Sequence, residues 1–269
     1  MMQREEIARK LIVQASAELR DIYNKGDIVR ENKDIDGSIV TYADKEIENF
    51  LVEGIKKYFP NDIIIAEEGS GGANDIFSAK DKFIWFIDPI DGTRNFVSGI
   101  PFFAISIGLM EDESLKFGII SEPLQENVFY AERGKGAFKN DVPMRVMPGD
   151  DMDENLIILG FIGKRNRIAT ANLLNKLVRT RVLGSAALNL CLVAQGKALG
   201  NIGLGFHTWD IAAGTIIVEE AGGKISDESG KSINIFQRDP LNIIATNGSV
   251  HDKILKEVNI AEKQPILGC

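Results

Sequence analysis

The sequence predicts an α+β fold with an antiparallel sheet in its first half and α/β layers in its second half. Two segments near the N-terminus place apolar residues at helical spacing, and several short apolar runs separated by turns follow from residue 62. Beyond residue 155, strand and helix patterns alternate. The chain has 269 residues, 44% of them hydrophobic and 26% charged, so it can bury one large core.

The first predicted helix spans residues 4–25, and Gly26 is its expected C-cap. The polar segment 27–40 shows no periodicity and is predicted to be a mobile loop. A second helix is predicted to begin at Thr41, because Asp44 stands three residues later as in a capping box.

The apolar runs from residue 62 onwards predict adjacent strands in an antiparallel sheet, and a glycine-bearing hairpin follows at "RGKGAFKN". The second half predicts, in order, strand 156–161, helix 167–179, strand 180–183, helix 185–196, strand 198–203, helix 208–221, strand 242–246 and helix 249–258. We expect an N-terminal metal-binding α+β half, 1–147, and a C-terminal α/β half, 148–269, that together make one catalytic unit.

The net charge of −8 argues against a nucleic-acid or anionic-membrane surface, and an acidic protein that handles phosphates would need metal ions. Cys191 lies in an apolar run and Cys269 is the last residue, so a reducing cytoplasm is expected. No apolar run approaches the roughly 18 residues of a membrane-spanning helix. The N-terminus lacks the features of a signal peptide, so we expect the mature chain to begin here.

The stretch "WFIDPIDGTRNF", Trp85 to Phe96, carries the strongest chemical signal. A buried strand is predicted to end at Asp88 and turn tightly, which presents Asp88 and Asp91 on one side. Two like charges at close range repel each other, and burying either one alone costs several kcal/mol. A divalent cation removes both penalties, and carboxylate ligands without Cys or His favour Mg²⁺ or Mn²⁺ over zinc.

Gly92 and Thr93 are predicted to begin a short helix whose free N–H groups attract an anion such as phosphate. A surface turn is the alternative, since Asp, Gly and Pro are the usual turn residues. The apolar run in front of Asp88 favours the site, because an exposed turn does not require a buried strand to aim it.

Other candidate residues have a structural alternative beside the functional one. Glu67 and Glu68 end a strand, either as solvated charges or as ligands beside Asp88. Asp44 and Asp210 each stand in the first turn of a predicted helix, where capping competes with a role near the metals.

Two further segments offer candidate residues, one around Asp210 and one before the helix predicted at 185–196. His207 is expected to pack or cap rather than act as a general base, and Trp209 is expected in the core. Gly184, Ser185 and Ala186 either bind a substrate hydroxyl or cap the helix that follows them.

Taken together, these motifs resemble the inositol monophosphatases, within the superfamily of Mg²⁺-dependent, lithium-sensitive phosphatases. The resemblance covers nearly the whole chain in order and spacing. It is carried by "VTYADKE", "IIIAEEG", "WFIDPIDGTRNFVSGIPFFAISIGL", "RGKGAF", "GSAALNLCLVAQG" and "WDIAAGTIIVEEAGG".

The resemblance implies a layered αβαβα sandwich of the sugar phosphatase type, usually a homodimer, with a tetramer as the alternative. It also implies a ligand set for two or three Mg²⁺ ions: Glu67, Asp88 and the Ile90 carbonyl for one, Asp88, Asp91 and Asp210 for a second, and Glu67 with waters for a third. It further implies that Thr93 and Asp44 orient and deprotonate the water that attacks phosphorus in line.

One departure bears on the substrate. Inositol-specific members have a glutamate where this chain has Gly203, seven residues before Asp210, so strict inositol specificity is not expected. Four cationic residues stand near the expected substrate edge, either as surface charges or as partners of a second phosphate: Arg94, Lys164, Arg165 and Arg167. The second reading favours a dual enzyme acting on fructose 1,6-bisphosphate as well as inositol 1-phosphate.

Two competing functions are weighed against this one. A phosphatase of the same superfamily could act on a nucleotide such as NADP or adenosine 3′,5′-bisphosphate, although the adenosine-bisphosphate enzymes usually carry extra segments. A non-catalytic metal-phosphate binding module would lack a carboxylate or the Thr/Asp pair, whereas both are present here.

Overall fold

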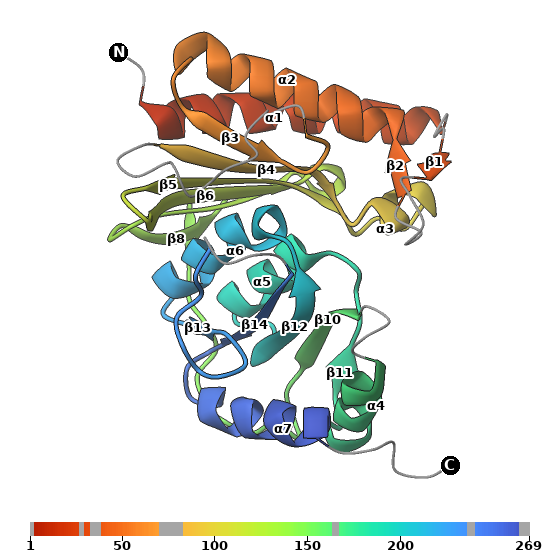
Figure 1. Ribbon diagram of the computed structural model, residues 1–269, viewed down its shortest axis with the longest axis vertical. Coiled ribbons are helices and arrows are strands. Elements are labelled where there is room, and N and C mark those ends of the chain that lie inside the picture. The colour runs from red at the N-terminus through yellow and green to blue at the C-terminus, as the bar shows by residue number, and fades with distance from the viewer. Residues whose placement is uncertain are drawn as a thin grey trace.

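The helices and sheets of the computed structural model stack in five layers (Figure 1). From the N-terminus these are a helix pair, a seven-stranded sheet, a second helix pair, a five-stranded sheet and an outer helix pair. Three hydrophobic clusters fill the spaces between them. The αβαβα sandwich is therefore confirmed. The structure describes residues 3–26, 30–32, 39–69, 83–162, 167–235 and 240–263.

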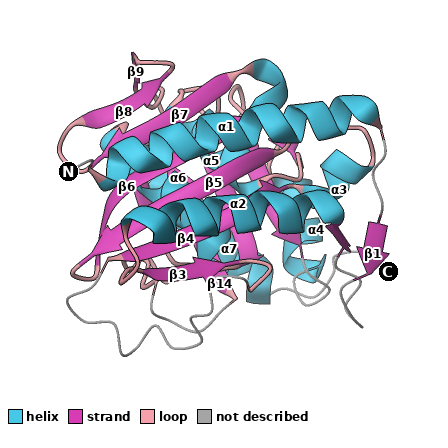
Figure 2. Ribbon diagram, turned by 90° about the horizontal axis from the view of Figure 1, so that it is seen from above, coloured by secondary structure: helices cyan, strands magenta, loops and turns pink. Residues whose placement is uncertain are grey.

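The first layer consists of α1 (Arg4–Lys25) and α2 (Tyr42–Tyr58), which lie side by side across the sheet (Figure 2). Their buried residues recur at helical spacing, as the apolar stripes predict. α1 ends at Gly26 in the left-handed conformation with φ 75°, and α2 begins at Thr41 with both capping-box hydrogen bonds present. Both predicted helices and both caps are confirmed.

Part of the segment predicted to be a mobile loop is instead ordered. β1 (Arg30–Asn32) and β2 (Ile39–Thr41) pair in antiparallel register, so this prediction is wrong for the described residues. Each of the two strands has only three residues, which is too short to carry a periodic signal. The pairing also fixes the backbone that leads into α2.

The seven-stranded sheet runs in sequence order, and all its neighbouring strands pair antiparallel except the first two. β3 is parallel to β4, which corrects the prediction of a purely antiparallel sheet. β9 was not predicted, because its three residues carry no periodic signal. The strands are β3 (Ile63–Ala66), β4 (Ile84–Asp91), β5 (Ala104–Glu111), β6 (Ser114–Glu122), β7 (Asn127–Glu132), β8 (Gly136–Lys139) and β9 (Val142–Met144), with the short 3₁₀ helix η2 (Pro123–Gln125) between β6 and β7.

The central layer consists of α5 (Ala186–Ala194) and α6 (Thr208–Glu220), whose side chains are buried on nearly every face. α6 approaches the first sheet closely at two glycines. A Cβ on Gly108 would lie 2.8 Å from the Ala212 Cβ, and one on Gly118 would lie 2.5 Å from the Ala213 carbonyl oxygen. One core cluster joins these helices to both sheets.

The second sheet has the order β11-β10-β12-β14-β13 and is covered on its outer face by α4 (Arg167–Lys176) and α7 (His251–Lys263). The alternation of strands and helices is confirmed, with ends shifted by a few residues. β13 was not predicted. The strands are β10 (Ile157–Ile162), β11 (Thr180–Arg181), β12 (Gly200–Phe206), β13 (Lys224–Ser226) and β14 (Leu241–Thr246). None of the described helices is long and apolar enough to cross a membrane.

Candidate active site

Four carboxylates gather where β3, β4 and the N-terminus of α6 meet. Glu67 directly follows β3, Asp88 and Asp91 lie within β4, and Asp210 stands in the first turn of α6. The strand does not end at Asp88 as predicted. It continues to Asp91 through a register shift against β5, and this irregularity brings both carboxylates to the cluster.

Asp88 is the centre of this acidic cluster and is only 1% exposed. Burial raises the pKa of Asp88 well above its ordinary value, and repulsion from Glu67, Asp91 and Asp210 raises it further. The Asp88 side chain also hydrogen-bonds to Glu67, and its Oδ1 accepts the Ile90 N–H at 3.1 Å. The predicted grouping of these four side chains is thus present in the fold.

Asp91 links the first sheet to the central helix layer. Its carboxylate accepts the Ser185 hydroxyl, the Ala186 N–H at 3.0 Å and the Ala187 N–H at 2.8 Å. Burial raises the pKa of Asp91 to about 6, while these three donors act in the opposite direction. Asp91 therefore holds the N-terminus of α5 against β4.

The capping alternative for the Gly184 segment is confirmed. The Ser185 hydroxyl accepts the Leu188 N–H at 3.2 Å, while Ser185 and Ala186 both donate to Asp91. A direct contact of Gly184, Ser185 or Ala186 with substrate stays a prediction.

Asp210 caps α6 and lies within the acidic cluster. One oxygen accepts the His207 N–H at 2.8 Å in a capping box. Burial raises the pKa of Asp210 to about 8, and repulsion from Asp91 and then from Glu67 adds to the increase. His207 caps α6 and stacks on Trp209, with ring centroids 4.7 Å apart, and Trp209 packs on the core, as predicted.

These carboxylates fit a hard divalent cation by their charge and burial. Glu67, Asp91 and Asp210 all oppose the ionisation of Asp88, and no cationic side chain is among the causes that act on its pKa. Oxygen donors of this kind suit Mg²⁺. In the part of the chain that the structure describes, no three His, Cys, Asp or Glu side chains already converge as a metal site. The assignment of individual ligands is therefore a proposal.

Thr93 and Asp44 lie beside the acidic cluster and share a hydrogen bond. The Thr93 hydroxyl lies 3.3 Å from Asp44 Oδ1 and 3.0 Å from the Ile90 carbonyl oxygen. Asp44 is fully buried, and its other oxygen accepts both the N–H and the hydroxyl of Thr41. Asp44 thus caps α2 with one oxygen and faces Thr93 with the other.

The predicted helix start at Gly92 is confirmed, although α3 (Thr93–Val97) is short. Gly92 adopts φ 92°, and a Cβ there would lie 3.1 Å from the Gly184 carbonyl oxygen. Asn95 donates to the carbonyl oxygens of Phe102 and Leu183, each at 2.8 Å. The turn after β4 is therefore fastened to the segment that leads into α5.

Glu48 is a buried acidic residue that the sequence reasoning missed. It lies one turn after Asp44 on α2 and is fully buried, and its Oε2 accepts the Glu68 N–H at 2.7 Å. Glu48 therefore holds the chain next to Glu67, while Glu68 contributes its backbone to this contact. The available signal was an acidic residue within the apolar stripe, between Ile47 and Leu51.

The cationic residues expected at the substrate edge are only partly described. Lys164 and Arg165 lie outside the described residues, and Arg167 begins α4. Arg94 directly follows Thr93 and is exposed.

Gly203 lies buried on β12, where an aromatic ring occupies the space of a side chain. A Cβ on Gly203 would lie 2.0 Å from Phe206 Cε2, and one on Gly160 would lie 2.5 Å from Phe206 Cζ. The Phe206 ring is 4% exposed. The departure at Gly203 is thus accompanied by an aromatic side chain that fills the adjacent space.

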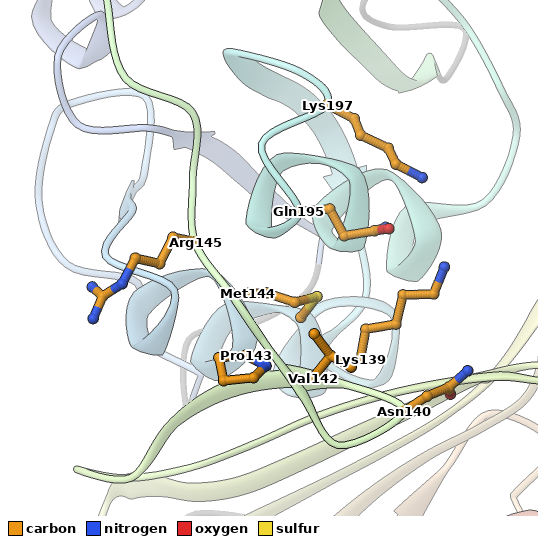
Figure 3. A pocket seen from close by; sticks show the side chains of 8 residues that line it. All are labelled: Lys139, Asn140, Val142, Pro143, Met144, Arg145, Gln195 and Lys197. Atoms are coloured by element: carbon orange, nitrogen blue, oxygen red, sulfur yellow. The ribbon is translucent and has the colours of Figure 1, made fainter.

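A groove of about 430 Å³ lies between the β8–β9 hairpin and the segment after α5. Lys139 and Lys197 extend toward the same side of the groove, whereas Arg145 points away from them (Figure 3). Asp91 holds the opposite, N-terminal end of α5. The groove is therefore separate from the acidic cluster, and its lining residues are not part of the candidate active site.

Known proteins match this chain over most of its length. A model of the inositol monophosphatase family matches residues 1–263. Fructose-1,6-bisphosphatase/inositol-1-monophosphatase of Thermotoga maritima is 41% identical over 225 residues, which cover 82% of each protein. Inositol monophosphatase 1 of Bos taurus is 34% identical over 256 residues, 89% of this chain and 91% of its own.

The fold agrees with these matches. The structure of Thermotoga maritima IMPase superposes with a TM-score of 0.85 at 36% identity, over 97% of this chain and 98% of that one. The fold and the sequence matches together define a phosphoric monoester hydrolase of the αβαβα type. The chain belongs to the inositol monophosphatase family, whose members are generally metal-dependent.

Proposed function

We propose that this protein hydrolyses phosphate monoesters of small polyols and sugars with Mg²⁺ as its cofactor and Mn²⁺ as a substitute. The observation that carries the proposal is the buried acidic cluster next to the Thr93–Asp44 hydrogen bond. Glu67, Asp88, Asp91 and Asp210, with the Ile90 carbonyl, would hold the cations. When bound, the cations would lower the pKa of water and stabilise charge on the phosphate and leaving oxygens.

The residues of this chain would orient the attack and accept a proton. The Thr93 hydroxyl can pass its proton to Asp44 Oδ1 and in turn accept one from the attacking water. Gly92 lacks a side chain, which lets the turn beside Thr93 lie against the Gly184 and Phe102 carbonyl oxygens. The Ile90 carbonyl competes with Asp44 for the Thr93 proton, so the orientation of Asp44 decides whether this transfer can occur.

We propose a broad substrate range that includes both inositol 1-phosphate and fructose 1,6-bisphosphate. Gly203 provides no hydrogen-bonding side chain on β12, and Phe206 fills the space beside it. The second phosphate of a bisphosphate could also pair with the cationic side chain of Arg94, Lys164, Arg165 or Arg167. The Thermotoga maritima relative, whose name combines both activities, supports this choice over an inositol-specific enzyme.

We further propose a cytoplasmic homodimer, with a tetramer as the alternative. The buried, unpaired thiol of Cys191 suits a reducing compartment. Size-exclusion chromatography with light scattering measures the assembly directly, and a monomeric mass would contradict this part of the proposal.

Phosphate release from a substrate panel tests the function. The panel contains inositol 1-phosphate, fructose 1,6-bisphosphate, NADP and adenosine 3′,5′-bisphosphate, each assayed in Mg²⁺ and in EDTA, with Asp88→Asn as the inactive control. We expect the highest kcat/KM for the first two and no turnover in EDTA. A preference for either nucleotide would replace the substrate class, and full activity in EDTA after dialysis would refute the metal assignment.

A further inference from the structure

Thr41 makes three hydrogen bonds to Asp44. The Thr41 hydroxyl accepts the Asp44 N–H at 3.3 Å and donates to Asp44 Oδ2 at 2.5 Å, and the Thr41 N–H donates to the same oxygen at 2.8 Å. Thr41 is 1% exposed and Asp44 is fully buried. Both the backbone and the carboxylate of Asp44 are therefore oriented by Thr41.

The two oxygens of Asp44 consequently have different neighbours. Oδ2 receives two hydrogen bonds from Thr41, whereas Oδ1 is the oxygen that the Thr93 hydroxyl reaches. A carboxylate fixed through one oxygen has lost its freedom to rotate about the bond to Cβ. This constraint keeps Oδ1 on the side of Thr93.

The Thr93 contact is sensitive to the placement of Asp44, because its length of 3.3 Å is at the long end for an O–H donor. The Thr93 hydroxyl has one proton and a second acceptor, the Ile90 carbonyl oxygen, at 3.0 Å. A small rotation of Asp44 would leave this proton on Ile90. A carbonyl oxygen cannot take over the proton as a carboxylate can.

We propose that Thr41 is a positioning residue for the reaction: by binding Asp44 Oδ2 it keeps Oδ1 within reach of the Thr93 hydroxyl. The inference rests on the proposed function, because it assigns Thr41 a role through the Thr93–Asp44 pair. It goes beyond helix capping, since a cap requires only that Thr41 accept the Asp44 N–H, whereas positioning requires that the hydroxyl also donate.

The test compares Thr41→Val, which removes the hydroxyl and keeps the shape, with Thr41→Ser, which keeps it. We expect Thr41→Val to lower kcat by about 10-fold to 100-fold, the same range as for groups that orient metal ligands from behind. KM and the Mg²⁺ concentration for half-maximal activity should stay within about twofold, because the Thr41 hydroxyl hydrogen-bonds to Asp44, which is not among the proposed cation ligands. Thr41→Ser should restore kcat to within about threefold of the original.

Two controls separate positioning from stability. Thr41→Val also weakens the start of α2, so all assays run well below the midpoint of thermal unfolding, and Thr41→Ala replaces it if it does not fold. Gln3→Ala disrupts the capping box of α1, far from Thr93 in sequence, and should leave kcat unchanged. In a Thr93→Ala background, Thr41→Val should lower kcat by less than about twofold more, because the two residues act as one unit.

The outcomes distinguish this inference from the proposed function. If Thr93→Ala loses activity while Thr41→Val keeps its kcat, the positioning role is overturned and the function stands. If Thr41→Ser is as slow as Thr41→Val, the hydroxyl is not the positioning group and the inference is likewise overturned. If Thr93→Ala and Asp44→Asn both keep full kcat, the proton relay of the proposed function itself fails.

Discussion

Two buried polar clusters, one within the second half and one where the two halves meet, differ in how their polar groups are satisfied. In the second half, His251 hydrogen-bonds to Ser226 at 2.8 Å and to Thr246 at 2.9 Å. Ser226 donates its own proton to the Asp227 carbonyl, so it accepts from the His251 Nε2–H, and His251 Nδ1 accepts from Thr246. The neutral ring is fully satisfied.

The acidic cluster has the opposite character. Asp88 is as buried as His251, yet its neighbours Glu67, Asp91 and Asp210 carry the same sign of charge and oppose its ionisation. A satisfied cluster of neutral groups stabilises the fold by itself, whereas a cluster of like charges costs stability until a cation joins it. The His251 cluster therefore stabilises the fold, whereas the acidic cluster is the one that we propose binds cations.

The largest effect should come from removing a carboxylate at the centre of the acidic cluster. We expect Asp88→Asn to lower kcat/KM by more than about 100-fold, because loss of a proposed ligand should exceed the roughly 10-fold to 100-fold cost of changing a group that only orients a ligand. Glu68→Gln should stay within about tenfold, because Glu68 contributes a backbone N–H to Glu48. Phosphate release at saturating Mg²⁺ measures both, and equal, mild effects would mean that the cations bind elsewhere.

The second-largest effect should appear in the chemical step and leave metal binding unchanged. Thr93→Ala should lower kcat by about 10²-fold to 10⁴-fold, since positioned proton transfer contributes this much, with little change in KM or in Mg²⁺ affinity. Adding Asp44→Asn should cost little more, because members of one unit are not additive. Steady-state kinetics of the four variants measure the coupling, and independent, multiplying losses would refute the relay.

A smaller effect should appear in the stability of the protein without cations. Asp91 and Asp210 have pKa values of about 6 and about 8 in the fold, above the ordinary 3.8. Acids whose pKa is raised by folding give stability that is present below the unfolded value and lost as pH rises through the folded value. In EDTA, the free energy of unfolding should therefore fall as pH rises from about 4 to about 8.

Denaturant titrations at each pH measure this trend, with Asp88→Asn as the control that relieves the repulsion. Added Mg²⁺ should flatten the dependence, because it stabilises the ionised carboxylates. A free energy of unfolding that stays constant across this range in EDTA would contradict the mutual repulsion within the cluster.

The smallest predicted effect concerns His251, where the free energy of unfolding changes with pH in the opposite direction. Burial lowers the pKa of His251 from 6.5 to about 4. The unfolded chain therefore binds a proton first as the pH falls, so the stability is intact above about 6.5 and is lost as pH falls toward about 4. At saturating Mg²⁺, His251→Gln should remove this dependence from the unfolding free energy. A dependence that persists unchanged would place its origin in another group.

The sequence indicated most of the elements and the grouping of the acidic residues. Helical stripes gave α1 and α2, and Asp44, Glu67, Asp88, Asp91 and Asp210 stood out as carboxylates at the ends of predicted elements. Two structural features were not accessible in this way. The parallel pairing of β3 with β4 and the irregularity inside β4 depend on neighbours distant in sequence.

By itself, the sequence determined the periodicity of the helices, the caps at Thr41 and Gly26 and the residue types that favour Mg²⁺, because these follow from local geometry and ligand chemistry. Only the tertiary structure decided that the second oxygen of Asp44 faces Thr93 and that Asp91 is tied to α5. Such contacts join segments distant along the chain, and their distances are set by how the layers pack.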